Sequence, residues 1–319
     1  MPRFDVTTIG EGQLRYCVPA GQRLEQVSQF QVYVAGTEAN VTGLLARLGW
    51  RCGWVSSLPN NPLGRRVSNE LRLAGLDLSA VIWPDEGRLA TYYVEYATPP
   101  RSTQVYFDRA NTCFTRLTLD QIEWDYLLDT RLLHLSGLTV PLSPSVKTIV
   151  IEAVQRAKAG GVQVSFDMNY RQRVWGAAEA AVTVKPIIRQ VDLLFCGRSD
   201  ARRVFGCDGS PEEIVLQLAE LTEAGYIITS LADEGLIGWD RQQFYRQPAR
   251  AVEIIDRIGA GDAMVGGVLH GWLQGDFAKG LRYGALTAAL ALSQWGDQVL
   301  TTAEELEVLL EADSGDIFR

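Results

Sequence analysis

Histidine and lysine are scarce in this 319-residue chain, and its cysteines form no paired motif. The only histidines are His134 and His270, which leaves little support for a histidine-rich metal site or a Ser-His-Asp hydrolase. The five cysteines are scattered, odd in number and without a C-x-x-C pair. Such usage is typical of buried thiols in a reducing compartment rather than of a disulfide framework or a zinc site. We therefore expect a cytoplasmic protein.

Long apolar runs are missing as well. No run approaches the roughly 20 residues that cross a bilayer, and residues 1–12 contain no apolar core of a signal peptide. The net charge of −8 argues against nucleic acid or an anionic membrane as the main partner. A small-molecule ligand, including an acidic one held by local arginines, is compatible with this charge.

The chain does contain ample apolar residue, 47%, which suits the core of one large α/β domain or two small ones. Apolar strand patterns alternate with helical patterns along most of its length. This βαβ rhythm predicts a doubly wound, mostly parallel sheet flanked by helices, in a single domain spanning residues 1–319. Ligands of such sheets bind beyond the carboxyl ends of the strands. Polar clusters follow the predicted strands, at residues 36–40, 167–171, 197–200, 230–235 and 256–262.

Two regions, within about 12–35 and 89–110, have a different texture. The stretch 90–96 is aromatic and β-branched, and it predicts one strand of a hairpin within the second region. Together with short strands in the first region, the hairpin could form a small separate sheet that serves as a lid or a subunit contact. An edge hairpin of the main sheet is equally consistent with this texture.

The stretch 256–262 carries the strongest chemical signal. An apolar run at 252–255 predicts a strand leading into it, and small residues after it predict a helix. Gly259 and Gly261 allow a tight turn, and free N–H groups at the helix start favour an anion such as phosphate. Asp262 beside such an anion could accept a hydroxyl proton during phosphoryl transfer. An ordinary strand–turn–helix with Asp262 as the helix cap is the alternative.

Other polar side chains expected at this edge have two interpretations each. Arg171 and Arg109 could bind a carboxylate or phosphate bidentately, or they could form surface ion pairs. Asn40 could bind sugar hydroxyls or cap its helix. Tyr92 could pack over a ligand or fill the seam between lid and body. Asp297 could reach the pocket or occupy a plain turn.

These residues resemble the ribokinase-like (PfkB-type) carbohydrate kinases over essentially the whole chain. Residues 256–263, Asp-Arg-Ile-Gly-Ala-Gly-Asp-Ala, match that family's DTxGAGD signature except at Arg257. The resemblance implies a ribokinase-like fold with a small β-sheet lid, and Asp262 as the catalytic base. It also implies an anion hole formed by Gly259, Ala260 and Gly261.

Within the family, the chain most resembles 2-keto-3-deoxygluconate kinases, through residues 36–40, 105–110, 166–171 and 296–297. This implies phosphorylation of the terminal hydroxyl of a small sugar acid, 2-keto-3-deoxygluconate, with ATP and Mg²⁺. The implied substrate-binding residues are Gly36, Asn40, Tyr92, Phe107, Arg109, Arg171 and Asp297. The implied nucleotide contacts are Asn169, Ser230, Asp233, Gly235, Gly259 and Gly261. A homo-oligomer formed through the lid sheet is also expected.

Three departures from the family pattern leave other functions open. Residues 197–200 read Gly-Arg-Ser-Asp where the family usually has NxxE, so Asp200 is left as an indirect Mg²⁺ contact. Ala232 and Ala35 each replace a usual glycine. The alternatives are a kinase for a neutral sugar such as fructose or ribose, a nucleoside kinase, and a non-catalytic sugar- or nucleotide-binding relative.

Overall fold

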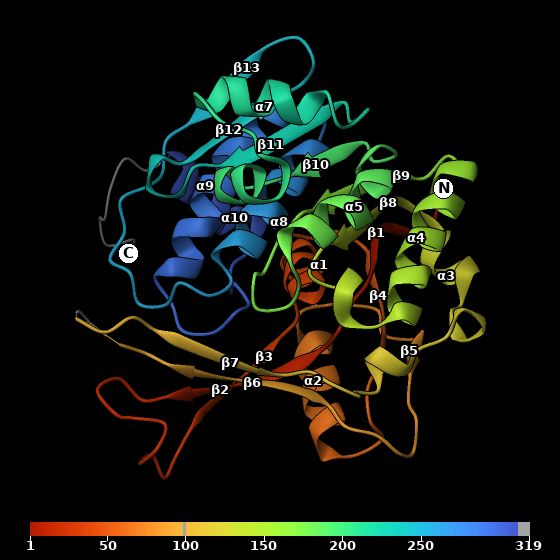
Figure 1. The fold of residues 1–319 in the computed structure, drawn as a ribbon, viewed down its shortest axis with the longest axis vertical. Coiled ribbons are helices and arrows are strands. Elements are labelled where there is room, and N and C mark those ends of the chain that lie inside the picture. The colour runs from red at the N-terminus through yellow and green to blue at the C-terminus, as the bar shows by residue number, and fades with distance from the viewer. Residues whose placement is uncertain (98–99, 312–319) are drawn as a thin grey trace.

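The computed structural model describes residues 1–97 and 100–311, and its centre is a nine-stranded sheet (Figure 1). Its strands are β1 (Phe4–Ile9), β4 (Cys52–Ser57), β5 (Val81–Ile82), β8 (Thr130–Ser136), β9 (Gln163–Asp167), β10 (Leu193–Phe195), β11 (Tyr226–Ser230), β12 (Leu236–Trp239) and β13 (Phe244–Gln247). They lie in the order β13-β12-β11-β10-β9-β8-β1-β4-β5. Neighbours from β11 to β5 are parallel, whereas β12 and β13 pair antiparallel at one edge. The predicted doubly wound, mostly parallel sheet is confirmed.

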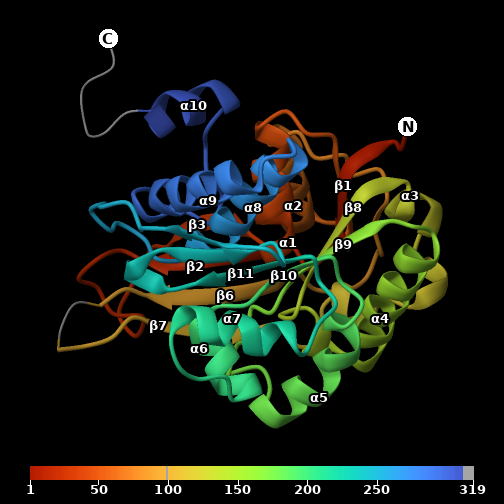
Figure 2. The same cartoon turned by 90° about the horizontal axis from the view of Figure 1, so that it is seen from above.

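Helices cover both faces of this sheet (Figure 2). They are α1 (Thr37–Arg47), α2 (Pro62–Leu73), α3 (Trp124–Leu128), α4 (Pro144–Ala159), α5 (Ala177–Ile188), α6 (Arg198–Asp200), α7 (Pro211–Ala219), α8 (Ala260–Leu273), α9 (Phe277–Leu292) and α10 (Ala303–Glu311). Helices α3, α4, α5 and α7 share one buried cluster with the sheet, and α1, α2, α8 and α9 share another. Strand β10 is apolar throughout because both of its faces are buried. Leu194 belongs to the first cluster, and Leu193 and Phe195 belong to the second. In the described part of the chain, no helix is long and apolar enough to cross a bilayer.

A second, four-stranded sheet lies apart from the first and is here called the lid sheet (Figure 1). Its strands are β2 (Gln13–Val18), β3 (Gln31–Ala35), β6 (Ala90–Glu95) and β7 (Gln104–Asp108), in the order β3-β2-β6-β7. Arg15 and Tyr92 are register partners and point toward Asp297 of the main body. The neighbouring pair Tyr16 and Tyr93 therefore lies on the opposite face of the lid sheet. The separate sheet is therefore confirmed, and the edge-hairpin alternative is wrong.

Glycines allow α8 and α9 to pack very closely, and this packing holds α8 in place on the sheet. A Cβ at Gly271 would lie 2.3 Å from the Cα of Gly280, and one at Gly267 would lie 2.7 Å from the carbonyl oxygen of Tyr283. Any larger residue at these positions would push the two helices apart. The close packing holds the start of α8 at the carboxyl edge of the sheet.

The segment that leads into α8 differs from its prediction. Residues 252–255 form no strand. Instead, the N–H groups of Ile255 and Asp256 donate to the carbonyl of Leu292, at 2.7 and 3.2 Å, where α9 ends. The apolar run suggested a buried strand, but Ile254 and Ile255 are 43% and 42% exposed. The run is paired with neither sheet and crosses the surface as an irregular segment.

Candidate active site

Two cavities meet at the carboxyl ends of the main strands. The lid cavity, of about 590 Å³, lies between the lid sheet and the main sheet. The α8 cavity, of about 640 Å³, lies beside α8 and α9. The predicted residues that line the lid cavity are Gly36, Asn40, Tyr92, Phe107, Asn169, Arg171, Gly259, Gly261, Asp262 and Asp297. Those that line the α8 cavity are Ser230, Asp233, Gly235, Ala260 and Gly261.

The carboxylate of Asp262 is buried and held by two side chains of α1. Its Oδ1 accepts a hydrogen bond from the Thr37 hydroxyl at 2.5 Å, and its Oδ2 accepts one from the Asn40 amide at 2.7 Å. Burial raises the pKa of Asp262 to about 6, although these two hydrogen bonds oppose the shift. A carboxyl with this pKa is mostly ionised at neutral pH and can still accept a proton. The geometry therefore suits a general base.

The start of α8 presents unused N–H groups to the ligand edge. Gly259 precedes the helix with φ of 92°, and a Cβ there would lie 2.7 Å from the carbonyl oxygen of Asp297. The N–H of Ala263 donates to the carbonyl of Gly259 at 2.9 Å. The three N–H groups before it, at 260–262, have no partner within the described residues. Asp262 thus lies inside the first helical turn, and the alternative in which it caps the helix is wrong.

The first turn of α1 connects Asp262 to the loop after β9. A Cβ at Gly36 would lie 2.6 Å from the carbonyl oxygen of Glu11, so the chain needs glycine there. Thr37 also accepts a hydrogen bond from the Asn169 amide at 2.8 Å. Asn169 has φ of 36°, a left-handed conformation that Asn tolerates better than most residues. Asn169 lines the lid cavity and not the α8 cavity, so it lies on the same side of the site as Asp262.

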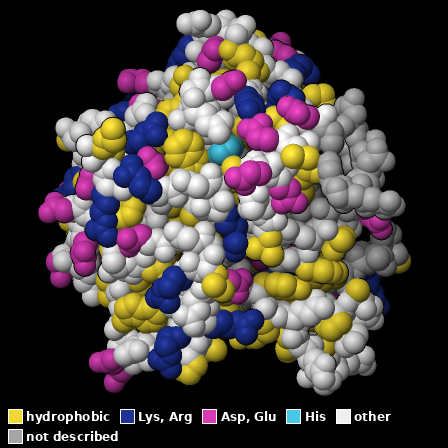
Figure 3. All heavy atoms as spheres, turned by 180° about the vertical axis from the view of Figure 1, so that it is seen from behind, with side chains coloured by type: hydrophobic (Ala, Val, Ile, Leu, Met, Phe, Trp, Pro, Cys, Tyr) yellow, Lys and Arg dark blue, Asp and Glu magenta, His cyan; other side chains and the backbone are white. Residues whose placement is uncertain are grey.

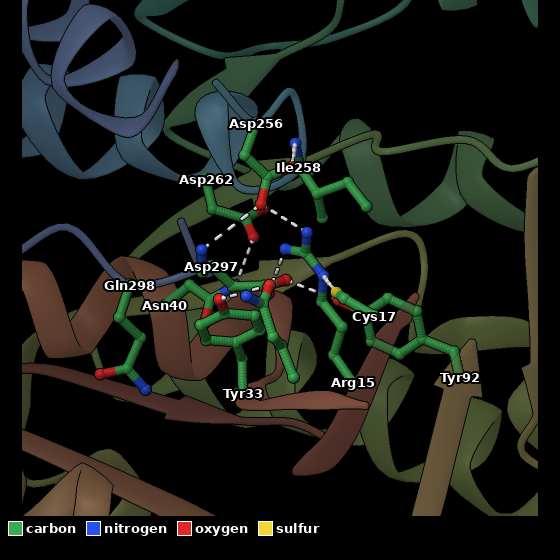
Figure 4. A network of polar contacts seen from close by, with 12 residues as sticks. Arg15, Cys17, Tyr33, Asn40, Tyr92, Asp256, Ile258, Asp262, Asp297 and Gln298 are labelled. Atoms are coloured by element: carbon green, nitrogen blue, oxygen red, sulfur yellow. Dashed lines mark hydrogen bonds and ion pairs between the residues drawn. The ribbon is translucent and has the colours of Figure 1, made fainter. Parts of the chain in front are cut away.

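Arg15, a buried arginine that the sequence analysis did not identify, joins the lid sheet to Asp256 and Asp297 of the main body (Figure 4). Arg15, on β2, has a fully buried side chain, and its Nη1 donates to Asp297 at 2.8 Å. Its Nη2 pairs with Asp256, whose carboxylate also accepts from the N–H of Ile258 at 3.0 Å. Asp297 further accepts from the Tyr92 hydroxyl at 2.6 Å. The lid strand thereby fixes the start of the 256–262 turn and the neighbouring loop at Asp297.

Asp297 therefore does more than occupy a plain turn. It lines the lid cavity, and both of its carboxylate oxygens have partners on the lid sheet. Apart from Gln13, the other residues of β2 are apolar or aromatic, and an arginine among them is the sequence signal that could have suggested a buried ion pair. Its partners could not be identified from that signal, because 241 residues separate Arg15 from Asp256 and 282 separate it from Asp297.

The two arginines predicted to converge on the pocket differ in placement. Arg171 lines the lid cavity, and its guanidinium has no hydrogen bond or ion pair within the described residues. Arg109 is buried and does not line that cavity, because its Nε pairs with Glu11 at 2.7 Å. The expectation that both arginines meet one ligand is corrected accordingly. The structure brings one of them, Arg171, to the cavity.

Two buried amide oxygens in the lid cavity have no hydrogen-bond partner. They are Oε1 of Gln13 and Oδ1 of Asn40. Buried acceptors are normally paired, so an unpaired one beside a cavity points to a ligand donor such as a hydroxyl. Phe107 packs on Tyr92 at a centroid distance of 5.7 Å and forms an aromatic wall of the same cavity. Gln13 was not predicted as a site residue.

The α8 cavity includes the turn between β11 and β12. Ser230, Asp233 and Gly235, which the family resemblance assigned to the nucleotide, line it. A Cβ at Gly235 would lie 2.1 Å from the carbonyl oxygen of Gln247, so this glycine is required. Ala232 has φ of 59°, in the left-handed region that glycine adopts more easily. The turn therefore keeps its backbone shape despite the alanine, at the expense of local strain.

The carboxyl groups near the two cavities are the possible contacts for Mg²⁺. Among residues 1–97 and 100–311, no group of three or more His, Cys, Asp or Glu side chains could hold a metal ion. Burial, with the nearby carboxylates of Asp262 and Asp200, raises the pKa of Asp167 to about 8. Asp200 accepts from the N–H of Tyr170 at 3.0 Å and lines neither cavity. Mg²⁺ keeps several waters and often binds one or two carboxylates with substrate phosphates. Asp167 and Asp200 could therefore contact Mg²⁺ only together with water and substrate phosphates, and not as a complete set of protein ligands.

Free N–H groups at a helix start, beside an oriented buried carboxylate at the ligand edge of a parallel sheet, define the site of a phosphotransferase. Comparison with known proteins agrees with this class. Residues 5–303 match the pfkB family carbohydrate kinases. The chain therefore belongs to the pfkB family of carbohydrate kinases, and it is a sugar kinase.

The chain is similar over nearly its whole length to three named sugar kinases. The chain is 34% identical over 313 residues to 2-dehydro-3-deoxygalactonokinase of Haloferax volcanii, covering 98% of both chains. It is 27% identical over 317 residues to 5-dehydro-2-deoxygluconokinase of Bacillus subtilis, covering 98% of this chain and 97% of the relative. The crystal structure of 2-dehydro-3-deoxygluconokinase from Thermotoga maritima matches with a TM-score of 0.90 and 28% identity, over 97% of this chain and 100% of the other.

Proposed function

We propose that this sugar kinase transfers the γ-phosphoryl group of ATP to the terminal hydroxyl of a small sugar acid, 2-keto-3-deoxygluconate, giving its 6-phosphate. One observation carries the proposal: the lid cavity contains both the oriented carboxylate of Asp262 and the unpartnered guanidinium of Arg171. A guanidinium binds a carboxylate bidentately, which a neutral sugar does not require. The similar proteins described above are all kinases of dehydro-deoxy sugar acids, which supports the same class of substrate.

The sugar acid would lie between the lid sheet and the start of α1. Arg171 would bind its carboxylate, and the unpaired oxygens of Gln13 and Asn40 would accept hydrogen bonds from its hydroxyls. The aromatic wall of Tyr92 and Phe107 would cover the carbon chain. Arg109 would act behind the cavity, by holding Glu11, rather than by touching the substrate.

ATP would occupy the α8 cavity, against Ser230, Asp233 and Gly235. Its γ-phosphate would lie at the N–H groups at the start of α8, where Gly259, Ala260 and Gly261 form the anion hole. Asn169 would face the reacting atoms from the base side. When bound with ATP, Mg²⁺ would neutralise part of the phosphate charge.

In the reaction, the terminal hydroxyl oxygen of the sugar forms a bond to the γ-phosphorus as the bond to the ADP oxygen breaks. Asp262 accepts the hydroxyl proton, and its oxygens are oriented for this by Thr37 and Asn40. In a loose transition state the proton leaves late, so the positioning of Asp262 matters more than its basicity. The lid sheet excludes water, which would otherwise accept the phosphoryl group.

We also propose that two copies of the chain meet through the outer face of the lid sheet. Tyr16 and Tyr93 stack there with centroids 5.4 Å apart, and Phe30 packs edge-on against Tyr16 at 5.8 Å. Tyr106, the register partner of Tyr93, is 50% exposed. Figure 3 shows charges of both signs interspersed over the back of the molecule and hydrophobic side chains gathered in its lower half. An exposed aromatic patch favours a protein contact.

The substrate proposal is tested by measuring ADP release with Mg²⁺·ATP and a panel of acceptors: 2-keto-3-deoxygluconate, its C4 epimer, fructose, ribose and a nucleoside. We expect turnover with the keto acid. Arg171→Ala should raise KM for that acid by about tenfold or more, because a charge-assisted bidentate contact contributes roughly 1.5–3 kcal/mol.

The matched control is Arg203→Ala, because Arg203 donates to the Gln172 side chain and lines neither cavity. Turnover with a neutral acceptor and no effect of Arg171→Ala would overturn the sugar-acid assignment. Binding of sugar or nucleotide without any ADP release would instead favour the non-catalytic relative.

A further inference from the structure

Arg257 lies where three cavities meet. It lines the lid cavity, the α8 cavity and a third cavity of about 510 Å³ beside the lid. Of the described residues, only Arg257 and Gly261 line both the lid cavity and the α8 cavity. Glycine has no side chain, so Arg257 is the single side chain that both cavities share. Its side chain is therefore placed to contact ligands in both cavities.

The guanidinium of Arg257 is exposed and uncommitted. It makes no hydrogen bond or ion pair within the described residues. The neighbouring carboxylate, Asp256, is already bound by Arg15. The other arginine of the α8 cavity, Arg250, donates to the carbonyls of Leu309 and Leu310, at 2.8 and 3.2 Å. Arg257 is therefore the cation that the α8 cavity leaves available in the described structure.

Negative charge lies on both sides of the place where the lid cavity and the α8 cavity meet. The carboxylate of Asp262 lines the lid cavity, and that of Asp233 lines the α8 cavity. A triphosphate placed between them would be repelled by like charges. A guanidinium fork matches phosphate oxygens bidentately, and charge on the transferred group spreads over its equatorial oxygens. The N–H groups at the start of α8 supply partial positive charge, and an arginine would supply a full one.

We propose that Arg257 is a catalytic residue that binds the phosphoryl group as it crosses from the α8 cavity to the lid cavity. The proposal rests on the function proposed above. Arg257 remains protonated throughout, the bond from phosphorus to the ADP oxygen breaks, the bond to the sugar oxygen forms, and Asp262 takes the hydroxyl proton. Because ATP carries the same γ-phosphate before transfer, Arg257 also contributes to binding ATP but not AMP.

Two measurements test this role on Arg257→Gln and Arg257→Lys. In steady-state assays, Arg257→Gln should lower kcat by about 100-fold, as expected for loss of one donor to transition-state charge. Its KM for the sugar should stay within about threefold of the wild-type value, and Arg257→Lys should keep part of the activity. In calorimetric titrations without sugar, Arg257→Gln should weaken ATP binding by about tenfold and leave AMP binding unchanged.

The control is Arg101→Gln, because Arg101 is an exposed arginine that lines the third cavity but neither of the other two. Melting temperatures of all variants should agree. A kcat within about threefold of wild type in Arg257→Gln, or an equal loss of ATP and AMP affinity, would overturn the proposal. If the wild type phosphorylates only a neutral sugar, the substrate assignment fails and kcat still tests Arg257. If no acceptor is phosphorylated, the comparison of ATP with AMP decides.

Discussion

The guanidinium of Arg15 donates through Nη1 to Oδ1 of Asp297 at 2.8 Å, with both side chains buried. One residue belongs to the lid strand β2 and the other to the loop after α9. The same guanidinium binds Asp256, so one lid residue connects the start of the 256–262 turn with the loop after α9. The position of this turn relative to the lid cavity thus depends on a contact from the lid.

Removal of Arg15 should be strongly destabilising. Arg15→Met leaves Asp256 and Asp297 buried without their counter-charge, and breaking a buried pair in this way costs about 3–5 kcal/mol. Urea unfolding measures the difference. Arg51→Met is the control, since Arg51 pairs with Asp5 but has a side chain that is 53% exposed, and it should change the free energy of unfolding little. Equal effects of the two variants would contradict a special role for Arg15.

The activity should depend on pH through Asp262. The carboxylate must be ionised to accept the hydroxyl proton, and its pKa is raised to about 6. We therefore expect kcat/KM to rise as pH increases through 6 and to level off above it. Asp262→Asn should fold normally and lose about 100-fold or more in kcat. A profile that stays flat down to pH 5, or an active Asp262→Asn variant, would contradict the assignment of the base.

The turn at Ala232 should be stabilised by glycine. Because Ala232 has φ of 59°, Ala232→Gly relieves backbone strain and should raise the free energy of unfolding by about 1 kcal/mol. Thermal and urea unfolding measure this. Ala181→Gly, within the regular helix α5, should act in the opposite direction by about 1 kcal/mol. Destabilisation by both substitutions would show that Ala232 is not strained.

The lid sheet should hold two copies together. Light scattering at working concentration should give the mass of a dimer or larger oligomer for the wild type. Tyr106→Glu places a charge in the exposed aromatic patch and should shift the mass toward the monomer. Phe244→Glu, on the edge strand β13 away from the lid, should leave the mass unchanged. A monomeric wild type would refute the contact.

Much of the site is local in sequence and could be predicted for that reason. Three features each depend on a few adjacent residues with restricted backbone conformations. They are the turn at Gly259 and Gly261, the carboxylate of Asp262, and the start of α1 at Gly36. Residues that follow parallel strands meet at one sheet edge, so Arg171 was also expected there. The lid was expected as one of two possibilities, since aromatic texture predicts strands but not their partners.

The amino-acid sequence by itself determined the alternation of strands and helices, the parallel sheet and the glycine turn before α8, because periodicity and glycine placement act over a few residues. Only the tertiary structure decided which charges are already paired. Glu11 binds Arg109 across 98 residues, and Arg15 binds Asp256 and Asp297 across still longer separations. Pairing depends on which strands lie side by side, and that arrangement left Arg171 and Arg257 available at the cavities.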